Sequence, residues 1–292
     1  MESAIEVPSR VEPWAFANEC PASSLPGEGD AHFCRRVAEK TRGRVSIRAV
    51  ADAALGFKSR DQLRAVAEGR VAMADTFSGA LAEVEPIFVL STLPFTVNGI
   101  GEARALYEAA RPGYEAAFAR HNQRLLFSTP WPASGLWTRA AVRSVEDIAG
   151  FRIRTYDDTG ARLFERLGAR ASVVSFSDLG ARIAAGEIDA VLSSGDGGAG
   201  QSLWEHFPTF TAIEYAMPLS FATINLDKWN SLDVATCGLL EETARETEAL
   251  QWRSLEGRVA ENYARMREHG VAIDTVIPAA LRERLRAAAS ER

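Results

Sequence analysis

Strand and helix patterns alternate along almost the whole of this chain. Short runs rich in β-branched and aromatic residues are separated by longer runs with apolar residues at helical spacing, most clearly between Val145 and Asp196. This alternation predicts an α/β protein with mainly parallel sheets. The predicted strands are Pro13–Ala17, Arg44–Val50, Val71–Thr76, Gln123–Ser128, Trp137–Val142, Phe151–Thr155, Ala171–Val174, Ile188–Leu192, Thr209–Glu214, Ser220–Asn225 and Val271–Val276.

Capping residues place helices in most of the gaps. The long stretch from Leu232 to Glu268 lacks proline and predicts one long helix or a bent pair. A first predicted helix opens at Gly29–Asp30 and ends near Gly43, and a second is capped by Ser59 with Asp61. Two more span Glu102–Arg111 and Pro112–His121. Of the last two, one is capped by Asp157 or Asp158 and runs to Leu167, and the other is capped by Ser177 or Asp178.

Arg154 is the charged residue best placed to bind a ligand. It lies at the end of a predicted strand, and ligands of open α/β sheets bind outside the carboxyl ends of the strands. The alternative is a surface arginine that ends a strand. Asp157 and Asp158 follow closely, and a helix cap explains them better than an acid–base pair, because adjacent side chains point in different directions.

Length and charge restrict the class of protein. At 292 residues the chain exceeds the usual size of one core, which favours two lobes. A net charge of −6, with scattered basic residues, argues against a nucleic-acid partner. The longest apolar runs, such as Ile87–Leu90, have the length of core strands. Isolated histidines provide no catalytic or metal-binding pattern, so neither a metal nor a cofactor is expected: His32, His121, His206 and His269.

The first residues and the cysteines bear on cellular location. Met1–Pro13 lacks the basic region, apolar core and cleavage site of a secretory signal, so either a signal has been removed or the protein is cytoplasmic. Cys20, Cys34 and Cys237 are odd in number and lack metal-site spacing. At most one disulfide can form, with Cys20 and Cys34 as the conceivable pair, and buried unreactive thiols are the favoured interpretation.

Two segments repeat the same pattern. "RAVAEGRVAMAD" and "ARIAAGEIDAV" each predict a helix, a glycine cap and a buried strand, with Gly69 and Gly186 at equivalent places. Chance similarity is the alternative, because such units are common. Duplicated α/β units that face each other across a cleft are typical of two-lobed binding proteins that close on a ligand.

Further segments occur in an order and spacing that carry a family resemblance. These segments are "FANECP" at 16–21, "LGFKSRDQLRAVAEGRVAMAD" at 55–75, "LSTLPF" at 90–95 and "FATINLDKWNSL" at 221–232. With them, the chain resembles the DctP-type extracytoplasmic solute receptors of tripartite ATP-independent periplasmic (TRAP) transporters. The resemblance implies a two-lobed, periplasmic-binding-protein-like α/β fold with a central cleft and a long helix spanning both lobes. Lobe I is expected at 1–130 with a return segment at 219–255, and lobe II at 131–218 with a C-terminal segment at 256–292.

The resemblance also implies a set of ligand contacts. Arg154 is expected to bind a carboxylate, since a guanidinium can make two parallel charge-assisted hydrogen bonds. Phe176 is expected under the ligand, and Trp131 against a ring face. The remaining expected contacts are Asn18, Glu19, Phe57, Lys58, Phe77, Ser78 and Asp157.

Two positions depart from the family's pattern. Ser134 stands where sialic-acid receptors carry a second arginine, and Ser193 replaces a common cleft asparagine. Sialic acid is therefore not expected as the ligand. Ser194 and Asp196 are expected to bind hydroxyl groups instead. A single arginine among neutral and acidic groups favours a monocarboxylate with several hydroxyls, such as a hexuronate or another sugar acid.

The segment Gly195–Gly200 permits a competing interpretation. It fits G-x-G-x-x-G, follows a predicted strand and precedes Glu214, which is typical of a nicotinamide-dinucleotide site. However, Asp196 would put a carboxylate into the pyrophosphate turn, and Pro208 limits the following helix. We therefore expect the glycines to let the backbone approach a ligand or the opposite lobe, with an anion-friendly helix N-terminus at Ala199.

The sequence thus predicts a receptor and not an enzyme. It is expected to capture a small organic acid in the periplasm, as a monomer, and to deliver it to the membrane subunits of a TRAP transporter. The alternatives are an NAD-dependent oxidoreductase using the glycine turn, and a sensory or scavenging binding protein of the same fold.

Overall fold

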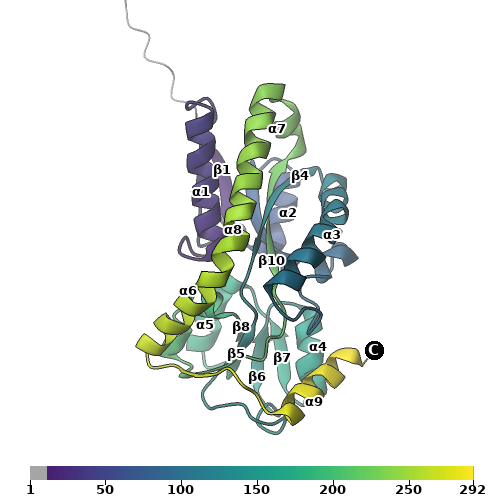
Figure 1. The fold of residues 1–292 in the computed structure, drawn as a ribbon, viewed down its shortest axis with the longest axis vertical. Coiled ribbons are helices and arrows are strands. Elements are labelled where there is room, and N and C mark those ends of the chain that lie inside the picture. Colours follow the sequence, from purple (N-terminus) through teal and green to yellow (C-terminus); the bar gives the residue numbers. More distant parts are fainter. Residues whose placement is uncertain (1–11, 292) are drawn as a thin grey trace, which may run out of the picture.

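Two β-sheets form the centres of the two halves of the molecule (Figure 1). The computed structural model describes residues 12–291. The first sheet, in the order β2-β1-β3-β10-β4, contains β1 (Trp14–Asn18), β2 (Ile47–Val50), β3 (Met73–Phe77), β4 (Gln123–Pro130) and β10 (Leu219–Asn225). The second sheet, in the order β11-β9-β5-β8-β6-β7, contains β5 (Gly135–Thr138), β6 (Arg152–Thr155), β7 (Arg170–Val173), β8 (Ala190–Ser193), β9 (Thr209–Thr211) and β11 (Ala272–Asp274).

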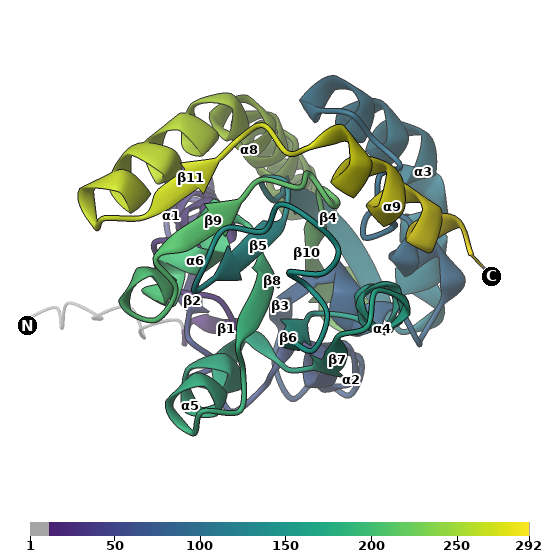
Figure 2. The same cartoon turned by 90° about the horizontal axis from the view of Figure 1, so that it is seen from below.

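Helices surround both sheets, as the view from below shows (Figure 2). The α-helices are α1 (Leu25–Lys40), α2 (Ser59–Ala67), α3 (Ile100–Arg120), α4 (Asp158–Arg166), α5 (Leu179–Ala184), α6 (Gly195–Gly200), α7 (Leu226–Asn230), α8 (Val234–Glu268) and α9 (Ala279–Ser290). Short 3-10 helices are η1 (Ser78–Leu81), η2 (Pro86–Val89), η3 (Phe176–Asp178) and η4 (Leu203–Glu205). No helix within 12–291 combines the length and apolar character needed to cross a bilayer.

Each sheet contains one strand that runs against the others, so the predicted mainly parallel sheets are in fact mixed. β10 is antiparallel to β3 and β4, and β5 is antiparallel to β8 and β9. The reason is the route of the chain. The chain leaves β4 at the junction between the two sheets and enters the second sheet there, so β5 begins at the junction and runs away from it. When the chain crosses back, β10 likewise begins at the junction and runs away from it into the first sheet. The predicted division into lobes at 130, 218 and 255 remains a prediction.

The predicted long helix is confirmed as one continuous helix, α8. Asp233 caps it by accepting a hydrogen bond of 2.8 Å from the Thr236 amide. At 1.5 Å per residue its 35 residues extend about 50 Å. It packs on α1 and β4 in the first half and on α6 and β11 in the second, and therefore bridges both (Figure 1).

Tertiary packing overrides some local signals. The two helices predicted on either side of Pro112 are one helix, α3. Pro112 lies on its exposed side, while Tyr107 and Tyr114 stack on the buried side with ring centroids 6.3 Å apart. The α1 helix begins earlier than predicted, because Ser24 caps it through a hydrogen bond of 3.3 Å from the Gly27 amide.

Several predicted strands differ in their bounds from the observed strands, and two of them also differ in what they contribute to the core. The strand predicted at Trp137–Val142 is β5, at 135–138, and Val142 instead enters the core behind the sheet. The predicted apolar strand at Ala171–Val174 is β7, which lies at the sheet edge with three of its four residues exposed. An edge position explains why its apolar character does not lead to burial.

The internal repeat has a structural counterpart. Gly69 and Gly186 follow α2 and α5 with φ of +68° and +69°, a conformation that favours glycine. The shift that carries Gly69 onto Gly186 also carries Met73, the first residue of β3, onto Ala190, the first residue of β8. Both units lead a strand to the junction between the sheets.

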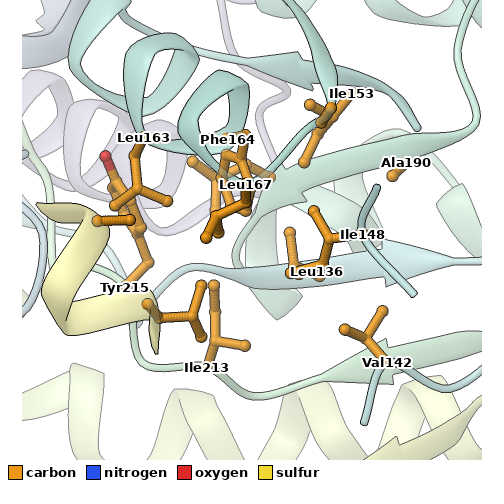
Figure 3. Packing of buried hydrophobic residues seen from close by; sticks show 14 of the residues in the cluster. Leu136, Val142, Ile148, Ile153, Leu163, Phe164, Leu167, Ala190, Ile213 and Tyr215 are labelled. Carbon is orange, nitrogen blue, oxygen red and sulfur yellow. The ribbon is translucent and has the colours of Figure 1, made fainter. Parts of the chain in front are cut away.

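The core of the second half fixes the strand that carries Arg154. Ile153 of β6 and Leu136 of β5 belong to one buried cluster with Phe164 of α4 and Tyr215 (Figure 3). Leu281 and its neighbours on α9 close the far side of this cluster. Because β6 also pairs with strands on both sides, its end is held firmly where the sheets meet.

Candidate functional site

A cavity of about 360 Å³ lies where the two sheets meet. Its walls come from the carboxyl ends of β1, β3 and β4 on one side and of β6 and β8 on the other. This is the place at which α/β sheets hold ligands. The predicted site residues that line the cavity are Glu19, Phe77, Trp131, Ser134, Arg154, Asp157, Phe176, Ser193 and Ser194.

Arg154 places a positive charge in this cavity. Its side chain is 4% exposed; Nε donates to the Val174 carbonyl at 2.9 Å and Nη1 to the Leu192 carbonyl at 3.2 Å. Within residues 12–291, no carboxylate lies within 4.0 Å of the guanidinium, and Nη2 has no hydrogen-bond partner. Burial lowers the pKa of Arg154 to about 10, although Glu19 acts in the opposite direction. The residue stays charged at neutral pH, and a buried charge needs an anionic partner.

Aromatic rings form one wall. Phe77 at the end of β3 meets Tyr156 edge to face, with centroids 5.3 Å apart, and Trp131 at 6.3 Å. The Tyr156 hydroxyl lies 3.3 Å from Ser134 Oγ, and the Trp131 indole donates to Ser220 Oγ at 3.1 Å. Rings of this kind offer apolar faces to a small ligand.

Tyr156 is a cavity residue that the sequence analysis missed. It lies two residues beyond Arg154, and residues two apart along an extended chain share a face. That spacing was the available signal. The other lining residues not predicted are Cys20, Ser59, Arg60, Gly79, Ala80, Ala82, Glu83, Asp158, Val173, Val174, Ser175, Gly197 and Pro218.

Glu19 joins the two walls. One carboxylate oxygen accepts from the Ser59 amide at 2.7 Å, and the other accepts from the amide and hydroxyl of Ser177 at 3.0 and 2.8 Å. These amides begin α2 and η3, which belong to different halves. Glu19 thus supplies the acceptor at both places, and the predicted caps from Ser59, Asp61 and Ser177 are wrong. Asp178 is the N-cap residue of α5, as predicted, although its side chain makes no capping hydrogen bond.

Asp157 has the predicted capping role. Its Oδ1 accepts from the Gly160 amide at 2.8 Å and so begins α4. Its Oδ2 has no partner among the described residues, and burial raises the pKa of this carboxyl. One of its two oxygens is thus already engaged by the backbone.

Comparison with known proteins decides the family. The family model for bacterial extracellular solute-binding proteins, family 7 (DctP), matches residues 16–291. The chain belongs to this family. A solute-binding protein of Chromohalobacter salexigens is 20% identical over 278 residues, which cover 94% of this chain and 82% of that protein.

Solved structures agree with this assignment. DctP7 of Bordetella pertussis, a receptor binding pyroglutamic acid, is 22% identical with a TM-score of 0.92 over 96% of this chain and 92% of its own. DctP6 of the same organism, also binding pyroglutamic acid, is 26% identical with a TM-score of 0.91 over 95% and 92%. A TRAP receptor of Chromohalobacter salexigens with bound D-glucuronate is 20% identical with a TM-score of 0.88 over 95% and 92%. The predicted family, two-lobed fold and function as a TRAP-type solute receptor are confirmed.

Two predicted contacts of this DctP-family receptor, Asn18 and Ser78, do not line the cavity. The Asn18 side chain donates to Asp30 at 2.7 Å and accepts from the Cys20 amide at 2.7 Å. Ser78 Oγ accepts from the Leu219 amide at 3.3 Å and is fully buried. Both side chains hold the strand ends in place, and their polar atoms are engaged within the protein.

Phe57 and Lys58 also lie outside the cavity. Phe57 packs under Arg70, whose guanidinium carbon lies 5.1 Å from the ring centroid. Lys58 forms a salt bridge of 2.7 Å with Asp178 in the other half. Since this ion pair is partly exposed to solvent, we expect it to contribute little stability.

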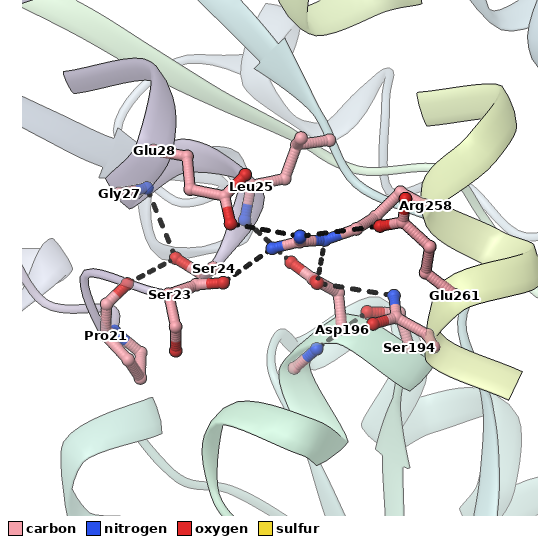
Figure 4. Close-up of polar contacts among 12 residues, drawn as sticks. Pro21, Ser23, Ser24, Leu25, Gly27, Glu28, Ser194, Asp196, Arg258 and Glu261 are labelled. Atoms are coloured by element: carbon pink, nitrogen blue, oxygen red, sulfur yellow. Dashed lines mark hydrogen bonds and ion pairs between the residues drawn. The ribbon is translucent and has the colours of Figure 1, made fainter. Parts of the chain in front are cut away.

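Asp196 is buried, 3% exposed, and does not line the cavity; its carboxylate takes part in a network of hydrogen bonds (Figure 4). Oδ2 accepts from the Leu25 amide at 2.8 Å, while Oδ1 accepts from Arg258 Nε at 2.6 Å and from the Asn262 amide group at 3.3 Å. The predicted hydroxyl recognition by Asp196 is replaced by this internal network.

The glycine turn that the dinucleotide interpretation requires is not formed. The expected close approach of the glycines is present, since Gly197 lines the cavity and a Cβ at Gly200 would lie 3.1 Å from Pro21 Cγ. Residues 195–200 are the helix α6 itself, which Ser194 caps by accepting from the Gly197 amide at 3.1 Å. The helix therefore begins at Gly195, not at Ala199. Glycine is required at Gly198 because a Cβ there would lie 2.1 Å from the Trp137 ring. The glycines thus permit close helix packing and do not form a loop that could cradle a pyrophosphate.

The described cysteines and histidines form neither a disulfide nor a metal site. Cys20, Cys34 and Cys237 are free thiols, so the conceivable Cys20–Cys34 disulfide is not formed. Burial raises the pKa of Cys34 to about 12. Within the part of the chain that the structure describes, no cluster of three or more His, Cys, Asp or Glu side chains could hold a metal ion.

A pair of buried carboxyls lies behind the cavity in the first half. Asp30 and Asp75 are 0% and 2% exposed, and each has an oxygen without a partner among residues 12–291. Burial raises the pKa of Asp30 well above its usual range and that of Asp75 to about 7. The folded protein therefore retains a proton that the unfolded chain, with an ordinary Asp pKa near 3.9, releases.

We expect the free energy of unfolding to fall as the pH rises from about 4 to 7, because over this range the folded state binds more protons than the unfolded state. Asp75→Asn should reduce this slope without abolishing it, because burial, the first cause of the raised pKa of Asp30, remains. The variant should be more stable than wild type at pH 8 by about 1 to 3 kcal/mol. Guanidinium unfolding midpoints at several pH values provide the measurement. Asp189→Asn is the control, since Arg152 lowers the pKa of that carboxyl, and an equal slope in wild type and Asp75→Asn would contradict the prediction.

Proposed function

We propose that this receptor binds a small organic monocarboxylate in the cavity between its two halves and delivers it to the membrane subunits of a TRAP transporter. The observation that carries the proposal is Arg154, a buried guanidinium in the cavity wall with no carboxylate within 4.0 Å in residues 12–291. A ligand carboxylate supplies the missing charge and can accept from the free Nη2.

The other polar groups favour a compact acid. Most groups expected to bind sugar hydroxyls are already engaged: Asn18 by Asp30, Glu19 by Ser59 and Ser177, and Asp196 by Arg258. Few acceptors remain for the several hydroxyls of a hexuronate, because each unpaired hydroxyl would cost free energy on burial. Pyroglutamate, which the similar DctP6 binds, has one carboxylate and one lactam group on a flat ring, and suits the aromatic wall of Phe77, Tyr156 and Trp131.

Sugar acids are the second candidate. The hydroxyls of Ser134, Tyr156 and Ser193 all reach the cavity wall and could pair with a sugar ring. The proposal also includes three further properties of the receptor. It binds its ligand without converting it chemically, it lies in the periplasm, and it is a monomer with no nucleic-acid partner. The prediction that Met1–Pro13 contains no secretory signal concerns mainly residues 1–11, which lie outside the described residues.

The test is a thermal-unfolding screen followed by calorimetry with pyroglutamate, D-glucuronate, D-galacturonate, L-malate and NAD. At one hundred times the dissociation constant a ligand adds about 2.7 kcal/mol of stability, which raises the midpoint of a chain of this size by several degrees. We expect the largest shift with pyroglutamate, a smaller shift with the hexuronates and none with NAD. A shift with NAD alone would overturn the receptor proposal, and uptake by vesicles containing the membrane subunits separates transport from sensing.

A further inference from the structure

Asp196 connects the two halves of the molecule at a single carboxylate. It lies in α6, which follows β8 of the second sheet, and it accepts a hydrogen bond from the Leu25 amide at the start of α1 in the first half. Leu25 belongs to the core cluster of the first half, together with Phe221 of β10. The bond between Asp196 and Leu25 is therefore a contact between halves and not within one.

Arg258 on α8 reinforces the same junction from a third element. Its Nε donates to Asp196 in the second half, while Nη1 donates to Glu28 at 3.0 Å and Nη2 to the Ser23 carbonyl at 2.5 Å in the first half (Figure 4). The Arg258 side chain is 14% exposed and Asp196 is 3% exposed, so water competes little for the bond between them, whereas Glu28 is 50% exposed. We call Asp196, Arg258, the Leu25 amide and the Ser23 carbonyl the interlobe staple.

The staple lies directly behind the cavity wall. Ser194 and Gly197, which flank Asp196 in the same helical turn, line the cavity from one side, and Glu19 and Cys20 line it from the other. A movement that separates α1 from α6 must break the Asp196–Leu25 bond and at the same time draw these walls apart. The cavity walls and the staple are thus mechanically linked.

We propose that Asp196 and Arg258 are positioning residues that hold the two halves together around the bound acid, and thereby set how long the acid stays bound. This inference rests on the proposed function of the cavity. The staple bonds join groups of both halves. In this proposal they form only in the closed form, and a contact made in only one of two states shifts the equilibrium towards that state. Loss of such a contact acts mainly on ligand dissociation.

The first experiment measures the kinetics of pyroglutamate binding by stopped-flow fluorescence, with Trp131 in the cavity wall as the reporter. We expect Asp196→Asn and Arg258→Lys to speed dissociation at least tenfold while association stays within threefold of wild type. The matched control is Asp189→Asn, which breaks an Arg–Asp pair of 2.7 Å between Arg152 and Asp189 inside the second half. A purely structural role would lower the unfolding midpoint and leave the dissociation rate of the folded molecules unchanged, and this result would overturn the proposal.

The second experiment separates a failure of this inference from a failure of the proposed function. If wild type binds none of the organic acids, the proposed function fails, and the staple is then tested by small-angle X-ray scattering without any acid. We expect a larger radius of gyration for Asp196→Asn and Arg258→Lys than for wild type and Asp189→Asn. Equal radii would overturn the staple. If Asp196→Asn does not fold, two other variants provide the same comparison. Arg258→Lys retains the charge, and Glu28→Gln removes the carboxylate that pairs with Arg258 Nη1.

Discussion

Replacing Arg154 by lysine is expected to weaken binding of the acid by about 2 to 4 kcal/mol, since the variant retains the charge but loses Nη2, the donor that the structure leaves free for a carboxylate. In the structure Nε and Nη1 are held by the Val174 and Leu192 carbonyls, which fixes the direction of Nη2. A lysine ammonium would meet those same carbonyls and leave less donor capacity for the ligand. Isothermal calorimetry with the best acid from the screen measures the loss.

The control for this prediction lies on the same strand. Arg152 is two residues before Arg154 on β6, but its guanidinium is exposed and pairs with Asp189. We expect Arg152→Lys to bind the acid with wild-type affinity. If Arg154→Lys bound within threefold of wild type, Arg154 would not contact the ligand, and the proposed function would lose the observation on which it depends.

The sequence could place Arg154 because the relevant information is local. A strand pattern ends, a helix cap follows at Asp157, and a side chain at that point must face the edge of the sheet. The family resemblance located Phe77 at the end of β3 and Ser193 at the end of β8, and both line the cavity. Whether each of them contacts a ligand remains a prediction.

The residues that were predicted as ligand contacts but do not line the cavity have a common explanation. Asn18, Lys58 and Asp196 also lie near strand ends or helix starts, but distant partners take up their polar atoms. Lys58 pairs with Asp178, and Asp196 with Leu25 and Arg258. A single sequence shows where a side chain leaves a strand, and it does not show which remote residue will satisfy it.

The errors in the fold have a similar origin. Nothing local in the runs that form β5 and β10 indicates that they run against their neighbours; the direction follows from where the chain crosses between the sheets. Pro112 is a helix breaker by propensity, yet the stacked rings of Tyr107 and Tyr114 keep α3 intact. In each case the path of the chain or a contact between side chains outweighs the local structural preference.

Gly198→Ala is expected to destabilise the receptor by about 3 kcal/mol, because overpacking of a filled core costs one to several kcal/mol. A Cβ at this position would lie 2.1 Å from the ring of Trp137. That ring is fully buried, donates to the Ser194 carbonyl at 3.2 Å and packs on Phe210 with centroids 5.2 Å apart. It cannot rotate away, so α6 must move instead.

Displacement of α6 should also affect the site, since Ser194 and Gly197 in the same turn line the cavity. We therefore expect Gly198→Ala to lower both the guanidinium unfolding midpoint and the affinity for the acid. The matched control is Gly238→Ala in α8, where a Cβ meets nothing within 4 Å and should stabilise the exposed helix by about 0.5 to 1 kcal/mol. A Gly198→Ala variant as stable as wild type would mean that α6 does not pack on Trp137 in solution, and both the cavity wall and the interlobe staple would then have to be placed anew.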